Sequence, residues 1–462
     1  MRARDVISRI SSVLPEVPKP IRAPSFNEKL LWTGLALVLY LIMSQIPLFG
    51  VTASASNSLY LYQVIFAANI GTLMTLGIGP IVTAGLIAQI LAGSDLMKLN
   101  FSMPDDQRFF SAFTKVLTFV FIIVEAIFYI FSGILGVSVT GNVALIVILE
   151  LIFASIAVFL LDQLVQKGWG IGSGISLFIL AGVAVQFMLD AFSPLPVNGQ
   201  YFGYVPYAIN ETIHRTLNAL SFRAASMPSL VGLVSTIGFI LLILYLEGIR
   251  IELPITSTKY KGFSGTYPIK LLYVSNIPVI LVAALIADLQ FFVTILSRYA
   301  SVTPYLSWLA VMVNGKVEGG ILYYISTPQP LPYTLQDPLQ MTTYILFVTL
   351  LSVLFARLWV DVSGMSASKA AENLLGSEVQ VPGFRSTKSS VTSILNKYIP
   401  AVTLLSGLII GILASTSAVL DVFGTGIGIL LAIDISINYY QTLVKEQLEV
   451  IMPRLGEFLG RK

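Results

Sequence analysis

The chain has 462 residues, of which 56% are hydrophobic and only 11% charged, with a formal net charge of +3 and a mean hydropathy of +0.85. Soluble domains carry roughly 25% charged residues, so this composition excludes a soluble enzyme. The chain has no cysteine and a single histidine, which excludes disulfide frameworks, thiolate nucleophiles and the usual metal sites and catalytic triads. We interpret that histidine, His214, as a solvated loop residue beside Arg215.

Apolar runs long enough to cross a bilayer recur along the whole chain. A spanning helix needs about 20 predominantly apolar residues, and ten charge-poor runs can be placed. Because they follow one another closely, we predict one all-α, polytopic membrane domain. The first run is long and starts far from the N-terminus, so we expect a span rather than a cleaved signal peptide. The predicted spans are 30–48, 72–93, 115–135, 143–164, 171–189, 228–246, 271–296, 342–360, 399–420 and 426–442.

The basic residues predict the orientation, because loops rich in Lys and Arg stay in the cytoplasm. With the N-terminus inside, the 27 Lys and Arg residues fall in or beside cytoplasmic segments except Arg215, Arg223, Arg298 and Lys316. Both termini are therefore predicted to be cytoplasmic. This requires an even number of spans, which agrees with ten.

One segment before the second span is irregular. Residues 51–70 contain no charge, and their apolar core, 59–68, is too short to cross a bilayer. Ser56 or Asn57 is a suitable N-cap. The segment predicts either a short helix folded back against the outer side or an interfacial external loop.

Two glycine-rich breaks each lead into a pair of bulky aliphatic residues. The break at 77–80 contains Ile78, which forms a pair with Val82, and the break at 168–174 precedes Ile175 and Ile179. Residues four apart lie on one helix face, so both pairs suit a hydrophobic constriction that closes a pore by dewetting. The alternative is that the glycines only let helices approach closely.

Glu125, Glu150, Asp288 and Asp434 are acids that lie within predicted spans. A charge at mid-membrane costs at least about 2.5 kcal/mol on insertion scales, so such residues are usually interior and functional. Glu150 could instead lie near a span end. An ion-coupled transporter would use Glu125, Asp288 and Asp434 as relays beside broken helices.

Two long cytoplasmic loops, about 249–270 and 361–398, are basic and rich in turn residues. We interpret them as projections. Basic residues there could serve topology alone, bind anionic headgroups, or dock a polyanion such as RNA.

Three stretches resemble the SecY family, the large subunit of the protein-conducting channel. They are GTLMTLGIGPIVTAGLIAQILAG (71–93), GWGIGSGISLFI (168–179) and YPIKLLYVSNIPVIL (267–281). The resemblance runs from about residue 26 to 447. The sequence of its second-span motif is closer to archaeal and eukaryotic members than to bacterial ones. It implies a channel of two pseudo-symmetric five-helix halves that opens sideways between spans two to three and seven to eight.

The resemblance also implies a division of the chain and a set of site residues. The divisions would be a cytoplasmic segment 1–29, an N-terminal half 30–190 with a re-entrant plug helix at about 54–70, an external hinge loop 191–227, a C-terminal half 228–444 and a cytoplasmic tail 445–462. The pore ring would be Ile78, Val82, Ile175, Ile179, Ile280 and Leu430 or Leu431; the plug would include Leu59, Tyr60, Val64 and Ile65. Lateral-gate positions would be Thr83, Glu125 and Asp288, and Arg250, Lys259, Lys261, Arg385 and Lys388 would dock a ribosome or another cytosolic partner.

The sequence departs from the family at two positions. Asn69-Ile70 stands where the family commonly has an arginine before the Gly-Thr of the second span, and Asp288 replaces a neutral polar residue such as Asn. Two acids, Glu125 and Asp288, would then face each other across the gate. Like charges disfavour joint ionisation, so Asp288→Asn is expected to change gate opening.

The resemblance implies a non-enzymatic translocon subunit without cofactor or metal. It would pass secretory proteins across the cytoplasmic membrane and release transmembrane segments laterally, bind signal peptides and nascent chains, and assemble with SecE/gamma and beta small subunits among membrane lipids. Two rivals remain open: an ion-coupled secondary transporter, and an intramembrane protease, for which we find no metal motif and no aspartyl pair in a protease-like motif.

Overall fold

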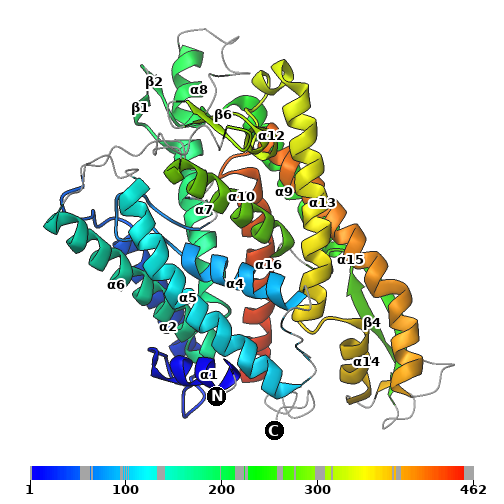
Figure 1. Cartoon of the computed structure of the whole chain (residues 1–462). Coiled ribbons are helices and arrows are strands. Elements are labelled where there is room, and N and C mark those ends of the chain that lie inside the picture. Colours follow the sequence, from blue (N-terminus) through cyan, green and yellow to red (C-terminus); the bar gives the residue numbers. More distant parts are fainter. Residues whose placement is uncertain are drawn as a thin grey trace.

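The computed structural model of the chain is mostly helical (Figure 1). It describes residues 3–51, 63, 66–93, 97, 99, 101, 103–132, 141–197, 199–213, 223, 227–257, 264–274, 277–296, 307–313, 316–376, 379–380 and 387–451.

Long helices run through both parts of the chain. The first part contains α1 (Ala3–Val13), α2 (Phe26–Met43), α4 (Gly79–Gly93), α5 (Pro104–Ser132), α6 (Asn142–Leu164), a π-helical turn η2 (Val165–Trp169) and α7 (Gly174–Phe192). The second contains α9 (Leu230–Gly248), α10 (Ile277–Leu296), α13 (Pro338–Val362), α14 (Ala367–Gly376), α15 (Lys388–Val419) and α16 (Gly426–Ile451).

The helical, polytopic fold predicted from the apolar runs is confirmed. Within the described ranges, eight helices are long and apolar enough to cross a membrane, and two shorter apolar helices, Gly79–Gly93 and Ile277–Val293, lie at the second and seventh predicted spans. Large apolar side chains on the outside of the bundle, such as Phe153 on α6, Leu241 on α9 and Leu350 on α13, are exposed. Such a surface suits lipid rather than water.

The predicted start of the second span is wrong. Residues 72–78 are not helical, and α4 begins at Gly79. Gly71 and Gly77 have φ values of 92° and 55°, which right-handed helices exclude, and Thr72 forms an isolated bridge with Pro47. The glycine-rich break therefore marks the point where the helix begins rather than a kink within it.

The ninth span starts earlier than predicted. α15 begins at Lys388, where Thr387 accepts a hydrogen bond from the Ser390 amide. Its 32 residues extend about 48 Å at 1.5 Å per residue, longer than the roughly 30 Å hydrocarbon core. The first turns of α15 therefore project beyond the bilayer and belong to the predicted loop 361–398.

The two long predicted loops form one projection. β3 (Arg250–Ser257) pairs with both β4 (Ser264–Lys270) and β7 (Val379–Gln380), so the two loops share a three-stranded sheet. Leu253 and Ile269 of the hairpin lie in a hydrophobic cluster with Ala371 of α14 and Leu395 of α15. Figure 1 shows this projection beside α14, at the end of the bundle where α1 also lies.

Short elements cover the opposite end of the bundle (Figure 1). Between α7 and α9 these are β1 (Pro196–Val197), β2 (Gln200–Tyr201) and α8 (Tyr204–Ile213); further on are β5 (Val311–Val313), β6 (Lys316–Gly319), α12 (Ile321–Ile325) and the 3-10 turn η4 (Tyr333–Gln336). The buried Arg223 donates to the carbonyl oxygens of Phe202 and Pro228 at 2.9 and 3.0 Å. This guanidinium ties the predicted hinge loop to the start of α9.

Candidate pore and lateral gate

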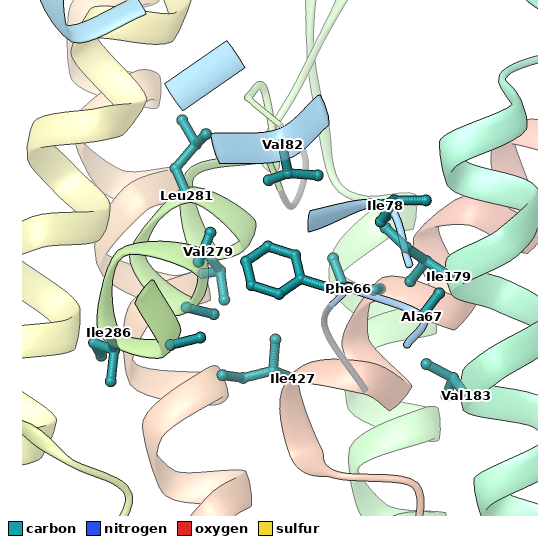
Figure 2. Packing of buried hydrophobic residues seen from close by; sticks show 14 of the residues in the cluster. Phe66, Ala67, Ile78, Val82, Ile179, Val183, Val279, Leu281, Ile286 and Ile427 are labelled. Carbon is teal, nitrogen blue, oxygen red and sulfur yellow. The ribbon is translucent and has the colours of Figure 1, made fainter. Parts of the chain in front are cut away.

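Residues 66–71, at the C-terminal end of the predicted plug segment, enter the centre of the helix bundle. Figure 2 shows the Phe66 ring among Val82, Val279 and Ile427, and Phe66 is fully buried. The backbone there is fixed by two hydrogen bonds of 2.8 Å: the Tyr40 hydroxyl donates to the Ala67 carbonyl and the Ile78 amide donates to the Phe66 carbonyl. A single aromatic side chain thus fills the middle of the apolar cluster.

Gly77 allows this close approach. A Cβ atom at residue 77 would lie 2.1 Å from the Phe66 carbonyl oxygen, and the φ of 55° already disfavours any other residue. The glycine of the break is therefore required by two independent constraints.

The seven candidate pore residues belong to one hydrophobic cluster. Ile78, Val82, Ile179, Leu430 and Leu431 are buried within it, and Ile175 and Ile280 are partly buried against it. They come from the start of α4, from α7, α10 and α16. Figure 2 shows Ile78, Val82 and Ile179 near Phe66, so residues far apart in sequence meet around one point.

The four candidate plug residues, Leu59, Tyr60, Val64 and Ile65, lie outside the described residues. What the structure describes of this segment is Gln63 and the stretch 66–71. The Ala68 amide donates to the Gln63 carbonyl at 2.8 Å, and the Asn69 amide donates to the Met74 carbonyl at 2.9 Å. This end of the segment is anchored to the strand-like chain before α4.

A buried carboxylate that the sequence analysis missed positions α7. Asp162 of α6 accepts a 2.8 Å hydrogen bond from the Ile175 amide, at the N-terminus of α7, and is held by Gln166 at 2.8 Å. A carboxylate is favourable at a helix N-terminus, where backbone N–H groups lack partners. Gly174 passes so close that a Cβ would lie 2.5 Å from the Asp162 Cα. The only sequence signal for this role was an acid inside an apolar run, twelve residues before the glycine.

Two of the candidate gate residues make direct contact. Thr83 of α4 is buried, and its Oγ1 lies 3.2 Å from Oδ2 and 3.4 Å from Oδ1 of Asp288 on α10. The hydroxyl donates and the carboxylate accepts. This hydrogen bond joins the predicted second and seventh spans.

Aromatic side chains join α5 to α10 beside this hydrogen bond. The Tyr129 and Phe291 ring centroids are 4.6 Å apart, and those of Phe128 and Phe292 are 5.7 Å apart in an edge-on arrangement. Pairs at such distances add about 0.5–1.5 kcal/mol beyond area burial. The sequence analysis did not predict these contacts.

The other intramembrane acids have different surroundings. Glu125 on α5 is buried. Glu150 on α6 accepts a 3.0 Å hydrogen bond from the Phe49 amide of the loop after α2. Asp434 on α16 is buried beside Glu247, whose carboxylate is 3.6 Å from the Lys270 ammonium. No group of three or more His, Cys, Asp or Glu residues suited to a metal ion occurs in the described part of the chain.

Two further acids lie where α7 meets the loop between α15 and α16. Asp190 of α7 is buried and accepts a 2.8 Å hydrogen bond from the Gly424 amide. The neighbouring Phe423 amide donates to Thr236 of α9 at 2.9 Å. Asp421 has a φ of 56°, and burial together with the Asp190 charge raises the pKa of its carboxyl to about 7. Sequence alone did not single out either acid.

Two of the five candidate docking residues are described. Arg250 begins β3 opposite Lys270 and is exposed, and the exposed Lys388 at the start of α15 is 3.1 Å from Glu372. Lys259, Lys261 and Arg385 lie outside the described residues. The β3–β7 pairing brings the two loops that carry these residues onto one projection.

Comparison with known proteins identifies the family. A family model described as SecY matches residues 72–440, and one described as the plug domain of Sec61p matches residues 38–71. The protein translocase subunit SecY of Saccharolobus solfataricus is 40% identical over 474 residues, covering 99% of each chain. The chain belongs to the SecY family. As a SecY family member it is a protein translocase subunit with a plug region, so the resemblance based on motifs is confirmed and the transporter alternative is not favoured.

Solved structures agree with the SecY fold. A structure described as a protein-conducting channel matches with a TM-score of 0.83 at 34% identity, covering 95% of this chain and 97% of that one. Sec61 in a canine ribosome–channel complex from the endoplasmic reticulum matches with a TM-score of 0.81 at 34% identity, with the same coverage of both chains.

Proposed function

We propose that this SecY family member conducts unfolded secretory polypeptides through the centre of its bundle and releases hydrophobic segments sideways between α4–α5 and α10–α13. The proposal rests on the position of residues 66–71. Phe66 fills the point where the candidate ring residues converge (Figure 2). A plug seated there closes the route, and its removal opens it.

The ring needs no covalent chemistry. Aliphatic side chains such as those of Ile78, Val82 and Ile179 exclude water and ions by dewetting, and branched aliphatic groups adapt to any passing side chain without offering a hydrogen bond. We therefore infer a non-enzymatic channel, with no cofactor, that depends on a bound partner for energy.

The proposed lateral exit is closed by contacts between side chains. They include the Thr83–Asp288 hydrogen bond and the aromatic pairs between α5 and α10. Each contributes about 0.5–1.5 kcal/mol, so a hydrophobic signal peptide that replaces them with its own apolar contacts can separate the two sides.

The driving partner would dock on the projection formed by β3, β4, β7 and the start of α15. Arg250 and Lys388 support this, because cations suit a polyanionic surface, and the canine relative is bound to a ribosome. We infer a ribosome or another cytosolic partner there, and SecE/gamma and beta subunits against the bundle.

We further infer a cytoplasmic-membrane location with both termini in the cytoplasm. α1 and the end of α16 lie at the same end of the bundle as the basic projection (Figure 1). That arrangement agrees with the distribution of Lys and Arg. We also infer halves at about 30–190 and 228–444, hinged through 191–227.

The proposal is tested by disulfide crosslinking, which the cysteine-free chain allows. One cysteine replaces Ile78 and a second is placed in a stalled secretory nascent chain. We expect a crosslink that moves along the nascent chain as its length changes and that requires a functional signal sequence. Leu241→Cys on the exposed face of α9 is the matched control and should not crosslink.

The opposite result is equally informative. Membranes that still secrete but give no crosslink at Ile78, Ile175 or Ile280 would show that the polypeptide does not pass this cluster. Strict dependence on an ion gradient, with a small solute as cargo, would favour a transporter instead.

A further inference from the structure

One face of the N-terminal helix α1 is attached to α5. Arg4 on this face is 2.9 Å from Asp106 of α5, and the Lys115 ammonium of α5 donates to the Ser11 carbonyl at 2.9 Å. Ser11 is buried and Ile7, one turn earlier, is half-buried. This attachment fixes the rotation of α1 about its own axis.

A second face of α1 carries an exposed apolar stripe. Val6, Ile10 and Val13 are 40%, 46% and 85% exposed, and spacings of four and three residues place them on one line along the helix. Because the attached face is occupied by α5, this stripe points away from it. Three large apolar side chains in a row on a polar helix are typical of a helix that lies in a membrane interface.

The depth of α1 fits such an interface. Lys115, which holds α1, precedes Val120, an exposed apolar residue on the outside of α5, by five residues, which is about 7.5 Å along a helix. The headgroup layer on each side of a bilayer is about 5–7 Å thick, by difference between the total and hydrocarbon thicknesses. The stripe therefore lies level with the headgroups when Val120 contacts the acyl chains.

The charges around the stripe favour anionic lipid. Arg9 is exposed on α1, and Lys19 and Arg22 are exposed on the segment that follows it. The acid on that segment, Glu16, is neutralised by Lys115 at 2.7 Å and by Lys167. Asp5 is the opposing charge on α1, so the strip facing the headgroups is net basic.

We propose that α1 is a docking surface for anionic membrane lipid, with Val6, Ile10 and Val13 at the acyl boundary and Arg9, Lys19 and Arg22 at the headgroup phosphates. The occupant is the lipid surface itself, because α5, to which α1 is attached, carries exposed apolar residues such as Val120 that suit lipid. This function is separate from the route of the polypeptide and holds whether or not the central cluster is the pore. As a consequence of this docking, the headgroup layer restrains α5 through its contacts with α1.

The test uses the full chain reconstituted into vesicles of phosphatidylglycerol or phosphatidylcholine. An environment-sensitive fluorophore is attached to Ile10→Cys, and nitroxide-labelled lipid serves as the quencher. The matched control is Ser8→Cys, which is exposed on the polar side of the same helix. We expect blue-shifted emission and strong quenching for residue 10 in phosphatidylglycerol, weaker quenching in phosphatidylcholine, and neither effect for residue 8.

Two further experiments test the roles of charge and of protein partners. Arg9→Gln should reduce the quenching of the residue-10 label in phosphatidylglycerol, and added salt should do the same. Equal emission and quenching at residues 8 and 10 would overturn the proposal. So would shielding of residue 10 that appears only with the small subunits and without lipid quenching, because a protein would then cover the stripe.

Discussion

Thr83 on α4 donates a hydrogen bond to the carboxylate of Asp288 on α10, across 205 residues of sequence. It is a direct polar link between the two sides of the proposed lateral gate. Compared with the neutral polar residue that the family resemblance implies at this position, Asp288 keeps the acceptor and adds a charge. The Asp288 carboxylate therefore adds a polar contact to the aromatic pairs that join α5 to α10.

Asp288→Asn is predicted to make the gate harder to open. The amide oxygen of Asn can still accept from Thr83, while the cost of holding a charge in the seam disappears. We expect the closed gate to gain about 1 kcal/mol, the size of one hydrogen-bond contribution. The measurement is the disulfide yield between Phe128→Cys and Phe292→Cys, whose rings are 5.7 Å apart, with and without a signal peptide.

Thr83 supplies the matched variants for this experiment. Thr83→Ser keeps the donor and should behave as the parent, whereas Thr83→Val removes it and should lower the crosslink yield. If Asp288→Asn crosslinks and translocates like the parent at every pH tested, Asp288 does not control gate opening and the prediction is wrong.

Gly77→Ala is predicted to unseat the segment at 66–71. The new Cβ would lie 2.1 Å from the Phe66 carbonyl oxygen, and a left-handed φ costs an alanine roughly 1–2 kcal/mol by itself. We expect ion leakage through vesicles that hold the variant. Gly85→Ala in the following helix α4 is the control, since nothing lies within 4 Å of its Cβ, and it should stay sealed; equal tightness of both variants would contradict the role of Gly77.

Local pattern predicted part of this architecture. Apolar run lengths located the membrane helices, and the spacing of Ile78 with Val82 and of Ile175 with Ile179 indicated a common apolar cluster. The start of α4 at Gly79 escaped prediction because residues 71–73 pair with 46–48, and that pairing replaces a helical turn.

Partners distant in sequence account for most of the remainder. Asp190 accepts from Gly424, 234 residues away, and a single sequence carries no sign of that contact. Thr83 and Asp288 were selected through family resemblance and not through periodicity. The role of Asp162 was missed although its partner, Ile175, is only 13 residues away. A π-helical turn between them changes the direction of the chain, and the sequence pattern does not predict that turn.

Asp421→Asn is predicted to stabilise the protein at neutral and alkaline pH. Burial and the Asp190 charge raise the pKa of the folded-state carboxyl to about 7 from 3.8, so the folded protein binds an extra proton between those values. Stability from this group is therefore fully present below pH 3.8 and falls as pH rises towards 7. Asn also tolerates the left-handed φ of 56°.

The expected gain of Asp421→Asn is on the order of 1–3 kcal/mol at pH 8, after allowance for partial exposure. Thermal unfolding in detergent between pH 4 and pH 8, on parent and variant, is the measurement. The parent should lose stability across this range relative to the variant. Parallel curves would mean that Asp421 is ionised in the folded protein at all these pH values.

Glu16→Gln is predicted to loosen the N-terminal part of α5 under neutral conditions. Hydrogen bonds from Lys115 and Lys167 lower the pKa of the Glu16 carboxyl from 4.5, so its contribution is complete above about pH 4.5 and is lost as pH falls through the lower folded value. The carboxyl is half-exposed, which limits the loss to about 1 kcal/mol or less. Unfolding temperatures of parent and variant should differ at pH 7 and converge on acidification. Asp105→Asn is the control, because the ion pair of Asp105 with Arg108 is exposed and 4.0 Å long. This variant should leave the unfolding temperature at pH 7 unchanged. An equal loss in both variants would show that Glu16 does not stabilise α5 specifically.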